Sequence, residues 1–269
     1  MNRTTRRFGW IPDLPDRRDH LFSAPAPILQ KLPRKVNLTK LCPPIYDQGM
    51  LGSCTGNAIA GAVQFNRKKN KQEPDFIPSR LFIYYNERAM EGTVNADPGA
   101  MIRDGIKSVS KLGVCPEAMW PYDGNPFPDD PGDQYPANSQ LTRKPGRDCY
   151  AEAARHQVIS YQRLVQNISQ LRGCLAAGYP FVFGVTVYES IYDDAVSQTG
   201  DISMPGDGES IVGGHAMLAV GYDDATRVFI VRNSWGKAWG KKGYGTIPYS
   251  YLNDSTLASD VWTLRTIEG

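Results

Sequence analysis

A cysteine at the start of a predicted helix is the side chain in this sequence best placed to do chemistry. Ser53 is of the type that caps helices, and Cys54 follows it directly. Ala58, Ala62 and Phe65 then recur at helical spacing, which predicts one buried helix face. The first turn of a helix offers free backbone N–H groups and the positive end of the dipole. Both favour a thiolate, the nucleophilic form of cysteine.

A histidine and an asparagine about 160 residues further on supply the partners that a cysteine nucleophile needs. His215 stands before an apolar run that ends at residue 221 and predicts a buried strand. Residues 223–224 are a turn signal, and residues 227–232 predict a second strand, which Asn233 follows. Two strands joined by a short turn pair antiparallel, so we expect His215 and Asn233 at the same end of a sheet. The alternative is that Cys54 and His215 are ordinary buried core side chains.

Three segments, in this order, resemble the papain-like cysteine proteases. Residues 48–54 read Gln-Gly-x-x-Gly-Ser-Cys, residues 214–222 read Gly-His-Ala-x-x-x-Val-Gly-Tyr, and residues 233–244 read Asn-Ser-Trp-Gly-x-x-Trp-Gly-x-x-Gly-Tyr. The resemblance covers roughly residues 33–250 and is closest to the bacterial branch with a short N-terminal extension. It implies an α+β, two-lobed fold, with a cleft between a helical lobe and an antiparallel, β-barrel-like lobe.

The resemblance also implies a role for each motif residue. Cys54 would be the nucleophile, with its backbone N–H in the oxyanion hole, and His215 the base that later protonates the leaving amine. Asn233 would orient the imidazole, and Gln48 would donate its side-chain N–H to the oxyanion. Trp235 would cover the bond between His215 and Asn233. The implied reaction is cysteine endopeptidase hydrolysis through an acyl-thioester, with no cofactor and no metal.

The substrate cleft is located less firmly by the motifs. By position in the family, the residues that would bind an extended peptide and favour an apolar P2 side chain are Gly99, Met101, Ile102, Gly213, Gly214 and Ala216. Ala100 stands where the family has a second glycine, and Met101 and Ile102 fit equally well as the core of a helix over residues 101–112.

Two parts are expected along the chain. Residues 1–32 form an N-terminal extension, and residues 33–269 form the catalytic domain. The domain divides into a helical lobe over about 40–120, a Pro-, Gly- and Asp-rich insertion over about 121–150 and a β lobe over about 151–269. Four prolines disfavour helix in the extension. We interpret it as an inhibitory strap across the cleft; an arm on the back of the fold and a disordered tail are the alternatives.

Composition sets the remaining expectations. The net charge of +2 argues for no particular partner. The resemblance implies peptide or protein substrates, and we expect no nucleic-acid partner and a monomer. The sequence contains no run of 18 apolar residues, so we expect no membrane span. The basic N-terminus lacks the apolar region of a signal peptide. We therefore expect a cytoplasmic location or a non-standard export route. Leu51 stands where secreted relatives carry a disulfide cysteine. Pairing among Cys42, Cys115, Cys149 and Cys174 stays open.

Three other functions remain under consideration. The same site could serve peptide trimming, isopeptide cleavage or ligation. An inactive relative could serve as a binding module, although such proteins usually lose the cysteine or the histidine, and both are present here. A cell-wall peptidase with another Cys-His fold would lack the segment that begins at Asn233.

Overall fold

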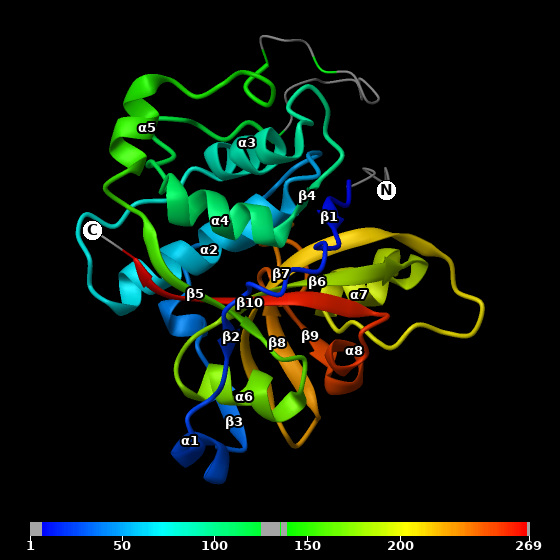
Figure 1. Ribbon diagram of the computed structural model, residues 1–269. Helices are drawn as coiled ribbons and strands as arrows, with labels where there is room; N and C mark the ends of the chain where they lie inside the picture. The colour runs from blue at the N-terminus through cyan, green and yellow to red at the C-terminus, as the bar shows by residue number, and fades with distance from the viewer. Residues whose placement is uncertain (1–6, 125–134, 136–138, 268–269) are drawn as a thin grey trace.

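The computed structural model describes residues 7–124, 135 and 139–267, which form a helical lobe above a β lobe (Figure 1). The helices are α1 Ala26–Gln30, α2 Cys54–Lys69, α3 Arg80–Glu91, α4 Ile102–Lys111, α5 Arg147–Ala153, α6 Ile168–Ala176, α7 Asp194–Thr199 and α8 Tyr249–Asn253, with 3-10 turns η1 Thr39–Leu41 and η2 Glu189–Tyr192. The strands are β1 Trp10–Ile11, β2 Leu21–Phe22, β3 Lys35–Asn37, β4 Ala100–Met101, β5 Val158–Leu164, β6 Phe181–Tyr188, β7 Ile211–Asp223, β8 Val228–Arg232, β9 Tyr244–Pro248 and β10 Ala258–Ile267.

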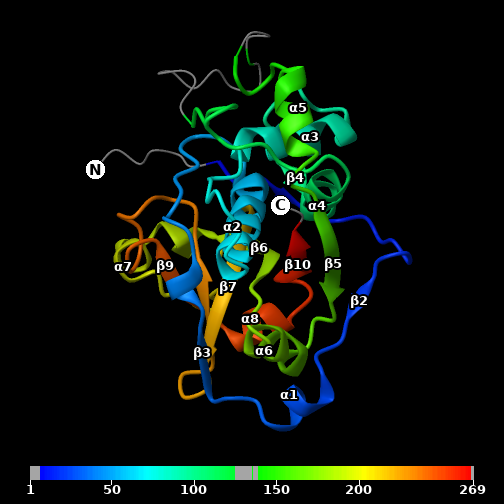
Figure 2. The same cartoon turned by 90° about the vertical axis from the view of Figure 1, so that its left-hand side faces the viewer.

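Helix α2 joins the two lobes. It packs against α3 and α4 on the helical side and against β7 and β10 on the other (Figure 2). Ser53 takes the predicted N-cap position, but its hydroxyl hydrogen-bonds Tyr122 and Asn57 rather than a backbone N–H of the first turn. The cap side chain therefore ties the start of α2 to the loop after the helical lobe.

The β lobe is built on a mostly antiparallel sheet, as the family resemblance implied, and its described strands do not close into a barrel. Within the described residues, eight strands pair in the order β2-β5-β10-β6-β7-β8-β9, and β3 pairs with β7. The edge strand β2 runs parallel to β5, whereas the inner pairs are antiparallel. The predicted hairpin of β7 and β8 is present, and it brings the start of β7 next to the chain that leaves β8.

The N-terminal segment has two different halves. Residues 7–13, which we call the clip, cross between the lobes, and β1 of the clip pairs parallel with β4 of the helical lobe. Residues 19–30 pack on the β lobe, where β2 extends the sheet and α1 lies against α6. Phe22 and Ala24 are buried in the β-lobe core. The Pro-rich run was expected to avoid helix, yet Pro25 directly precedes α1, where proline is well tolerated.

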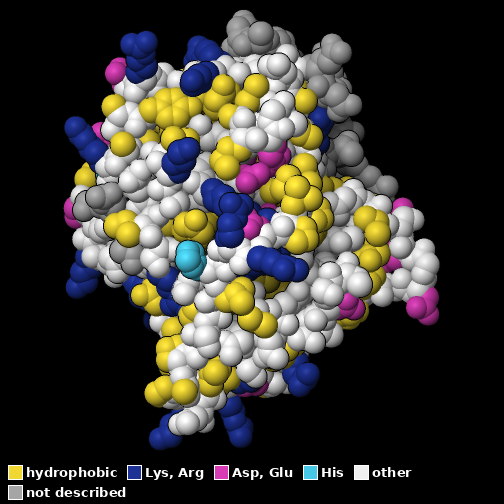
Figure 3. All heavy atoms as spheres, viewed as in Figure 1, with side chains coloured by type: hydrophobic (Ala, Val, Ile, Leu, Met, Phe, Trp, Pro, Cys, Tyr) yellow, Lys and Arg dark blue, Asp and Glu magenta, His cyan; other side chains and the backbone are white. Residues whose placement is uncertain are grey.

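Charged side chains gather in the middle of the face shown in Figure 3, the face that the N-terminal segment crosses in Figure 1. Residues 125–134 and 136–138 of the predicted surface loop over residues 121–148 lie outside the described residues, and α5 begins at the end of the loop. The five cysteines are all free and buried, so the pairing left open by the sequence is absent. Among the described helices, none is long and apolar enough to cross a membrane.

Candidate active site

Cys54 lies at the first position of α2, at the junction of the lobes, and is fully buried. Backbone N–H groups of three segments act on its thiol: Ala216 in β7, Gly9 in the clip and Thr55 in its own helix. Burial raises the pKa of the Cys54 thiol to about 12, and these three N–H groups oppose the shift. The helix position alone predicted a lowered pKa, so the structure shows the opposite direction while the clip is in place.

His215 and Asn233 lie side by side, as the hairpin predicts. The Nε2 atom of His215 is 2.8 Å from Oδ1 of Asn233, in a buried hydrogen bond. The backbone N–H of Ser234 donates to the same Oδ1 at 2.8 Å, which fixes the direction of the Asn233 amide. Trp235 stacks on the His215 ring with centroids 4.7 Å apart. The imidazole is therefore held from its edge and from its face.

Gln48 is buried on the other side of Cys54, on the loop before α2. Its Oε1 accepts a hydrogen bond from Ser234 Oγ at 2.7 Å, so its Nε2 points away from Ser234. The Nε2 donates to the carbonyl of Leu51 at 2.8 Å and to that of Arg7, in the clip, at 3.3 Å. The carbonyl oxygen of Arg7 thus occupies a position where the Gln48 side-chain amide can donate a hydrogen bond to it.

The clip fits the site through glycines of the catalytic domain. A Cβ atom at Gly99 would lie 2.1 Å from the carbonyl oxygen of Gly9, and a Cβ at Gly184 would lie 2.0 Å from Cε2 of Trp10. Gly213 and Gly214 likewise leave room for Phe8 and Trp10. Side chains at these positions would exclude the clip, so close backbone approach is the basis of the fit.

Trp10 fills a pocket that ends in a carboxylate. Its indole Nε1 donates to Oδ2 of Asp260 at 3.2 Å, and the backbone N–H of Asp13 donates to the same oxygen at 2.8 Å. Arg163 pairs with the other oxygen of Asp260 at 3.0 Å. Phe8 lies on the opposite side of Cys54, with its ring 6.1 Å from that of His215 and 6.0 Å from that of Trp235.

The predicted substrate-binding residues do not all face the clip. Gly99, Gly213 and Gly214 touch it, and Ala216 meets Cys54 through its N–H. Met101 pairs with Ile11 in the β1–β4 ladder, whereas Ile102 begins α4 and is fully buried in the core. The alternative interpretation, helix core, therefore describes Ile102.

Several residues at the site carried no sequence signal. Asp260 and Gly184 belong to no motif, and only the paired strands β10 and β6 bring them to the Trp10 pocket. Gly52 belongs to the first motif, but its contact with Gly9 depends on the clip. Asp97, which binds the N–H of Gly52 at 2.9 Å, also had no assigned role.

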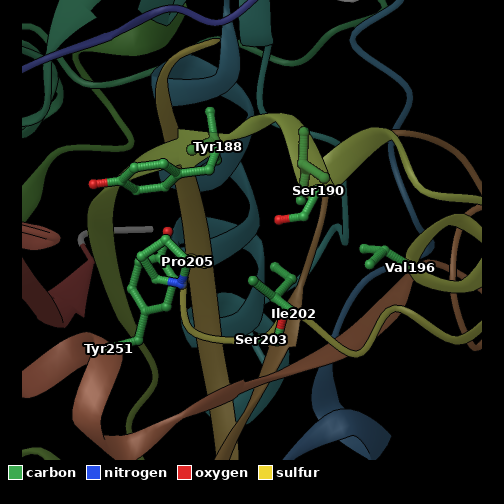
Figure 4. A pocket seen from close by; sticks show the side chains of 9 residues that line it. Tyr188, Ser190, Val196, Ile202, Ser203, Pro205 and Tyr251 are labelled. Atoms are coloured by element: carbon green, nitrogen blue, oxygen red, sulfur yellow. The ribbon is translucent and has the colours of Figure 1, made fainter. Parts of the chain in front are cut away.

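A second hollow lies beside the site, between the end of β6, η2 and the loop over residues 202–205 (Figure 4). It contains none of the candidate catalytic residues. Two of its lining residues, Ile191 and Val196, pack in the same apolar cluster as Trp235, so it adjoins the His215 side of the site. Among the described residues, no group of three His, Cys, Asp or Glu side chains could hold a metal.

Comparisons with known proteins found similar sequences and similar structures. The model of the papain family cysteine proteases matches residues 32–263. A peptidase C1-like protein of Acanthamoeba polyphaga mimivirus is 37% identical, with 98% of this chain and 88% of that protein covered. The crystal structure of xylellain, a cysteine protease from Xylella fastidiosa, is similar with a TM-score of 0.90 and 48% identity, covering 96% of each chain. Procathepsin B of Trypanosoma congolense shares the fold at a TM-score of 0.74 and 16% identity, covering 98% of this chain and 87% of that one.

Proposed function

Because this chain belongs to the papain family of cysteine proteases, and is thus a hydrolase acting on peptide bonds, we propose that Cys54 and His215 form its catalytic pair. We also propose that the clip holds the full-length chain inactive. The observation that carries the proposal is the position of Gly9. Its N–H is one of the backbone groups that oppose the rise in the pKa of the Cys54 thiol, while Phe8 lies on the His215 side and Trp10 fills a pocket on the other side.

The chemistry follows from the groups around Cys54. With the clip removed, water and substrate reach the sulfur, and proton transfer to His215 gives a thiolate–imidazolium pair. The thiolate attacks the substrate carbonyl and forms a C–S bond. Collapse of the tetrahedral intermediate breaks the C–N bond, and His215 gives its proton to the leaving amine. Water, deprotonated by His215, then hydrolyses the thioester and restores Cys54.

Negative charge on the carbonyl oxygen needs donors that are already in place. The Gln48 amide is held by Ser234, and its Nε2 already meets the carbonyl of Arg7. We assign Gln48 Nε2 and the backbone N–H of Cys54 as the two oxyanion donors. Asn233 keeps the His215 ring in the plane that both proton transfers require.

The clip blocks the site without serving as a substrate because its chain direction is reversed. His215 protonates the leaving amine, so the C-terminal part of a substrate must lie on the His215 side. In the clip, the N-terminal residue Phe8 lies there and Trp10 lies beyond Cys54. The parallel pairing of β1 with β4 fixes this direction. No peptide carbonyl of the clip therefore meets Cys54 with its amine side toward His215.

The Trp10 pocket supports a preference for a large apolar P2 side chain. Its walls include Gly184 and Gly214, which leave room for an indole. Asp260 at its end accepts an N–H, so the pocket also suits a P2 side chain that carries a donor at its far end. We propose aromatic or other bulky apolar P2 residues as the preferred class.

Covalent labelling by an epoxysuccinyl inhibitor, mapped by mass spectrometry, tests both parts of the proposal. The samples are the full-length chain, a chain beginning at Asp19 that lacks the clip, and Cys54→Ser in each form. We expect fast labelling at Cys54 in the shortened chain and at least about 10-fold slower labelling at full length. Trp10→Ala should speed labelling of the full-length chain, because burial of a Trp side chain contributes about 3–5 kcal/mol.

A matched control is available on the same segment. The side chain of Leu14 is 69% exposed, so Leu14→Ala should leave the labelling rate of the full-length chain unchanged. Equal labelling of full-length and shortened chains would discard inhibition by the clip and keep the protease. Absence of Cys54 labelling in the shortened, folded chain would discard the catalytic assignment.

A further inference from the structure

A buried carboxylate that the proposed mechanism does not use lies between α3 and β4. The side chain of Asp97 is fully buried. Its Oδ2 accepts a hydrogen bond from the backbone N–H of Gly52 at 2.9 Å, and its Oδ1 accepts one from the Tyr84 hydroxyl at 2.5 Å. The Tyr135 hydroxyl donates to Oδ2 at 3.4 Å, and Arg7 of the clip approaches it at 4.0 Å. A buried carboxylate is costly unless donors of this kind surround it, so these contacts show what Asp97 holds in place.

The Gly52 N–H belongs to the same peptide group as the Leu51 carbonyl. That carbonyl accepts the hydrogen bond from Gln48 Nε2 at 2.8 Å. The peptide group between residues 51 and 52 is therefore held on one edge by Asp97 and on the other by Gln48. Because a peptide group is planar, turning this one away from Asp97 also turns the carbonyl to which Gln48 donates. The direction of the Gln48 amide thus depends on Asp97.

The other oxygen of Asp97 is connected to the segment that the clip pairs with. The Tyr84 hydroxyl donates to Oδ1 of Asp97 and accepts a hydrogen bond from the backbone N–H of Gly99 at 3.1 Å. The next residue, Ala100, donates its N–H to the carbonyl of Gly9 in the clip at 2.8 Å. The five cysteines are free, so noncovalent contacts hold these segments together. One carboxylate therefore links the strand beside the clip to the loop that carries the oxyanion amide.

We propose that Asp97, supported by Tyr84, is a positioning residue for the oxyanion hole. It fixes the peptide group between residues 51 and 52 and, through that group, the side chain of Gln48. The inference rests on the proposed role of Gln48 as an oxyanion donor. Donors stabilise developing charge best when they are already oriented before the reaction. Loss of Asp97 should therefore slow peptide hydrolysis, and it should spare the attack of Cys54 on an epoxide, which develops no carbonyl oxyanion.

The ratio of two rates, both measured on the full-length chain, isolates this role. The first is kcat/KM for a fluorogenic peptide with phenylalanine at P2, and the second is the second-order rate of Cys54 labelling by an epoxysuccinyl inhibitor. Both reactions require the clip to leave the site, so the occupancy of the clip cancels in the ratio of hydrolysis to labelling. This cancellation is needed because Arg7 of the clip lies 4.0 Å from Asp97, and a change at Asp97 also alters clip docking.

Asp97→Ala should lower the ratio of hydrolysis to labelling about 10-fold. This is part of the roughly 100- to 1000-fold that complete loss of an oxyanion donor costs, because Gln48 is still present but less well oriented. A general loosening of the site would lower both rates together. An unchanged ratio in the folded variant, with folding checked by thermal unfolding, would therefore overturn the inference.

Tyr84→Phe is a milder variant that keeps the inference testable if Asp97→Ala does not fold. It removes the hydroxyl that donates to Oδ1 of Asp97, and it should lower the same ratio about 3-fold, as expected for one hydrogen bond. Tyr85→Phe is the matched control. It removes a hydroxyl one position along α3, outside this chain of hydrogen bonds, and should leave the ratio unchanged. Equal ratios for Tyr84→Phe and Tyr85→Phe would overturn the inference.

A double-mutant cycle shows whether Asp97 acts through Gln48. In a Gln48→Ala background the amide donor is already absent, so adding Asp97→Ala should change the ratio less than about 2-fold. A further loss of about 10-fold would mean that Asp97 acts by another route, contrary to the inference. An unchanged ratio in Gln48→Ala alone would reject the proposed role of Gln48. A lowered ratio in Gln48→Ala without an effect of Asp97→Ala would reject only the positioning role.

Discussion

Trp10 and Asp260 are hydrogen-bonded across 250 residues of sequence, with the indole Nε1 3.2 Å from the carboxylate oxygen Oδ2. The contact joins the N-terminal clip to the start of β10, at the end of the pocket lined by Gly184 and Gly214. The Asp260 carboxylate holds the clip in this structure. Under the proposed P2 preference, the same carboxylate would face the P2 side chain once the clip has left.

The first prediction concerns Asp260 and substrate choice. In the chain beginning at Asp19, Asp260→Asn should reduce kcat/KM for a substrate with arginine at P2 about 10-fold relative to phenylalanine, because a hydrogen bond to a charged group contributes about 1.5–3 kcal/mol. Asparagine tolerates the left-handed backbone of this position, where φ is 55°. Matched fluorogenic dipeptides measure the ratio. An unchanged ratio would place the P2 side chain elsewhere.

Gly184→Ala should act in opposite directions on the two forms. The added Cβ would lie 2.0 Å from Cε2 of Trp10, so the clip must shift and Cys54 labelling of the full-length chain should rise at least about 10-fold. The same methyl narrows the pocket, so the shortened chain should lose activity on a phenylalanine P2 substrate. Gly146→Ala is the control, since a Cβ there meets no atom within 4 Å. If labelling of the full-length chain and activity of the shortened chain both rose or both fell, the result would contradict a pocket shared by Trp10 and the P2 side chain.

Docking of the clip should weaken as pH rises. Burial, together with the nearby Asp260 carboxylate, raises the pKa of Asp13 from 3.8 to about 6 in the docked state. Because protonated Asp13 is favoured when docked, the stabilisation is complete below pH 4 and is lost as pH rises through 6. The ratio of the Cys54 labelling rate of the full-length chain to that of the chain beginning at Asp19 should increase by up to about 100-fold between pH 4 and pH 7.

Asp13→Asn separates this titration from the other charges. The neighbouring groups are Asp260, Arg103 with its backbone N–H, and the Trp262 indole, which donates to Asp13 at 3.0 Å. Asparagine keeps an acceptor oxygen for these donors and removes the charge. The labelling ratio of the variant should be nearly flat between pH 4 and pH 7, and a ratio that still rises with pH would assign the effect to another group.

Gln48→Ala should lower turnover without abolishing alkylation of the thiol. Loss of one oxyanion donor typically costs about 100- to 1000-fold in kcat, whereas attack of Cys54 on an epoxide develops no carbonyl oxyanion. The shortened chain therefore should hydrolyse peptides at least about 100-fold more slowly and still label at Cys54. A proportional loss of both activities would point to displacement of Ser234 and Asn233 rather than to a missing donor.

Local patterns in the sequence were sufficient for the groups around Cys54. The start of α2 and the β7–β8 hairpin are indicated by an N-cap residue type, by periodicity and by a turn signal, and these signals lie within a few residues of Cys54, His215 and Asn233. The far side of the pocket had no such signal. Asp260 and Gly184 reach it only through pairing of β10 with β6, which is decided by long-range packing.

The N-terminal extension shows a different limit of the sequence. An inhibitory strap and an arm packed on the fold were the alternatives. In the structure, residues 7–13 cross between the lobes and residues 19–30 pack on the β lobe, whereas inhibition by the first half stays a proposal. Strands β1 and β2 have two residues each, too few for a periodic pattern. Their partners, β4 and β5, determine where each half lies. Local propensity therefore could not locate the division.

Glu87 carries the last prediction, which concerns stability. It is buried behind Cys54 in the helical lobe and accepts a hydrogen bond from Thr55 Oγ1 at 2.7 Å. Burial raises its pKa from 4.5 to about 8, so its contribution to folding is complete below about pH 4.5 and is lost as pH rises through 8. Glu87→Gln removes this penalty and should stabilise the protein above pH 8 by up to about 4 kcal/mol, with little change at pH 4.5. Thermal unfolding of the variant, of wild type and of the exposed control Glu189→Gln at both pH values measures the difference. A gain of equal size at the two pH values would mean that packing, rather than ionisation of Glu87, is responsible.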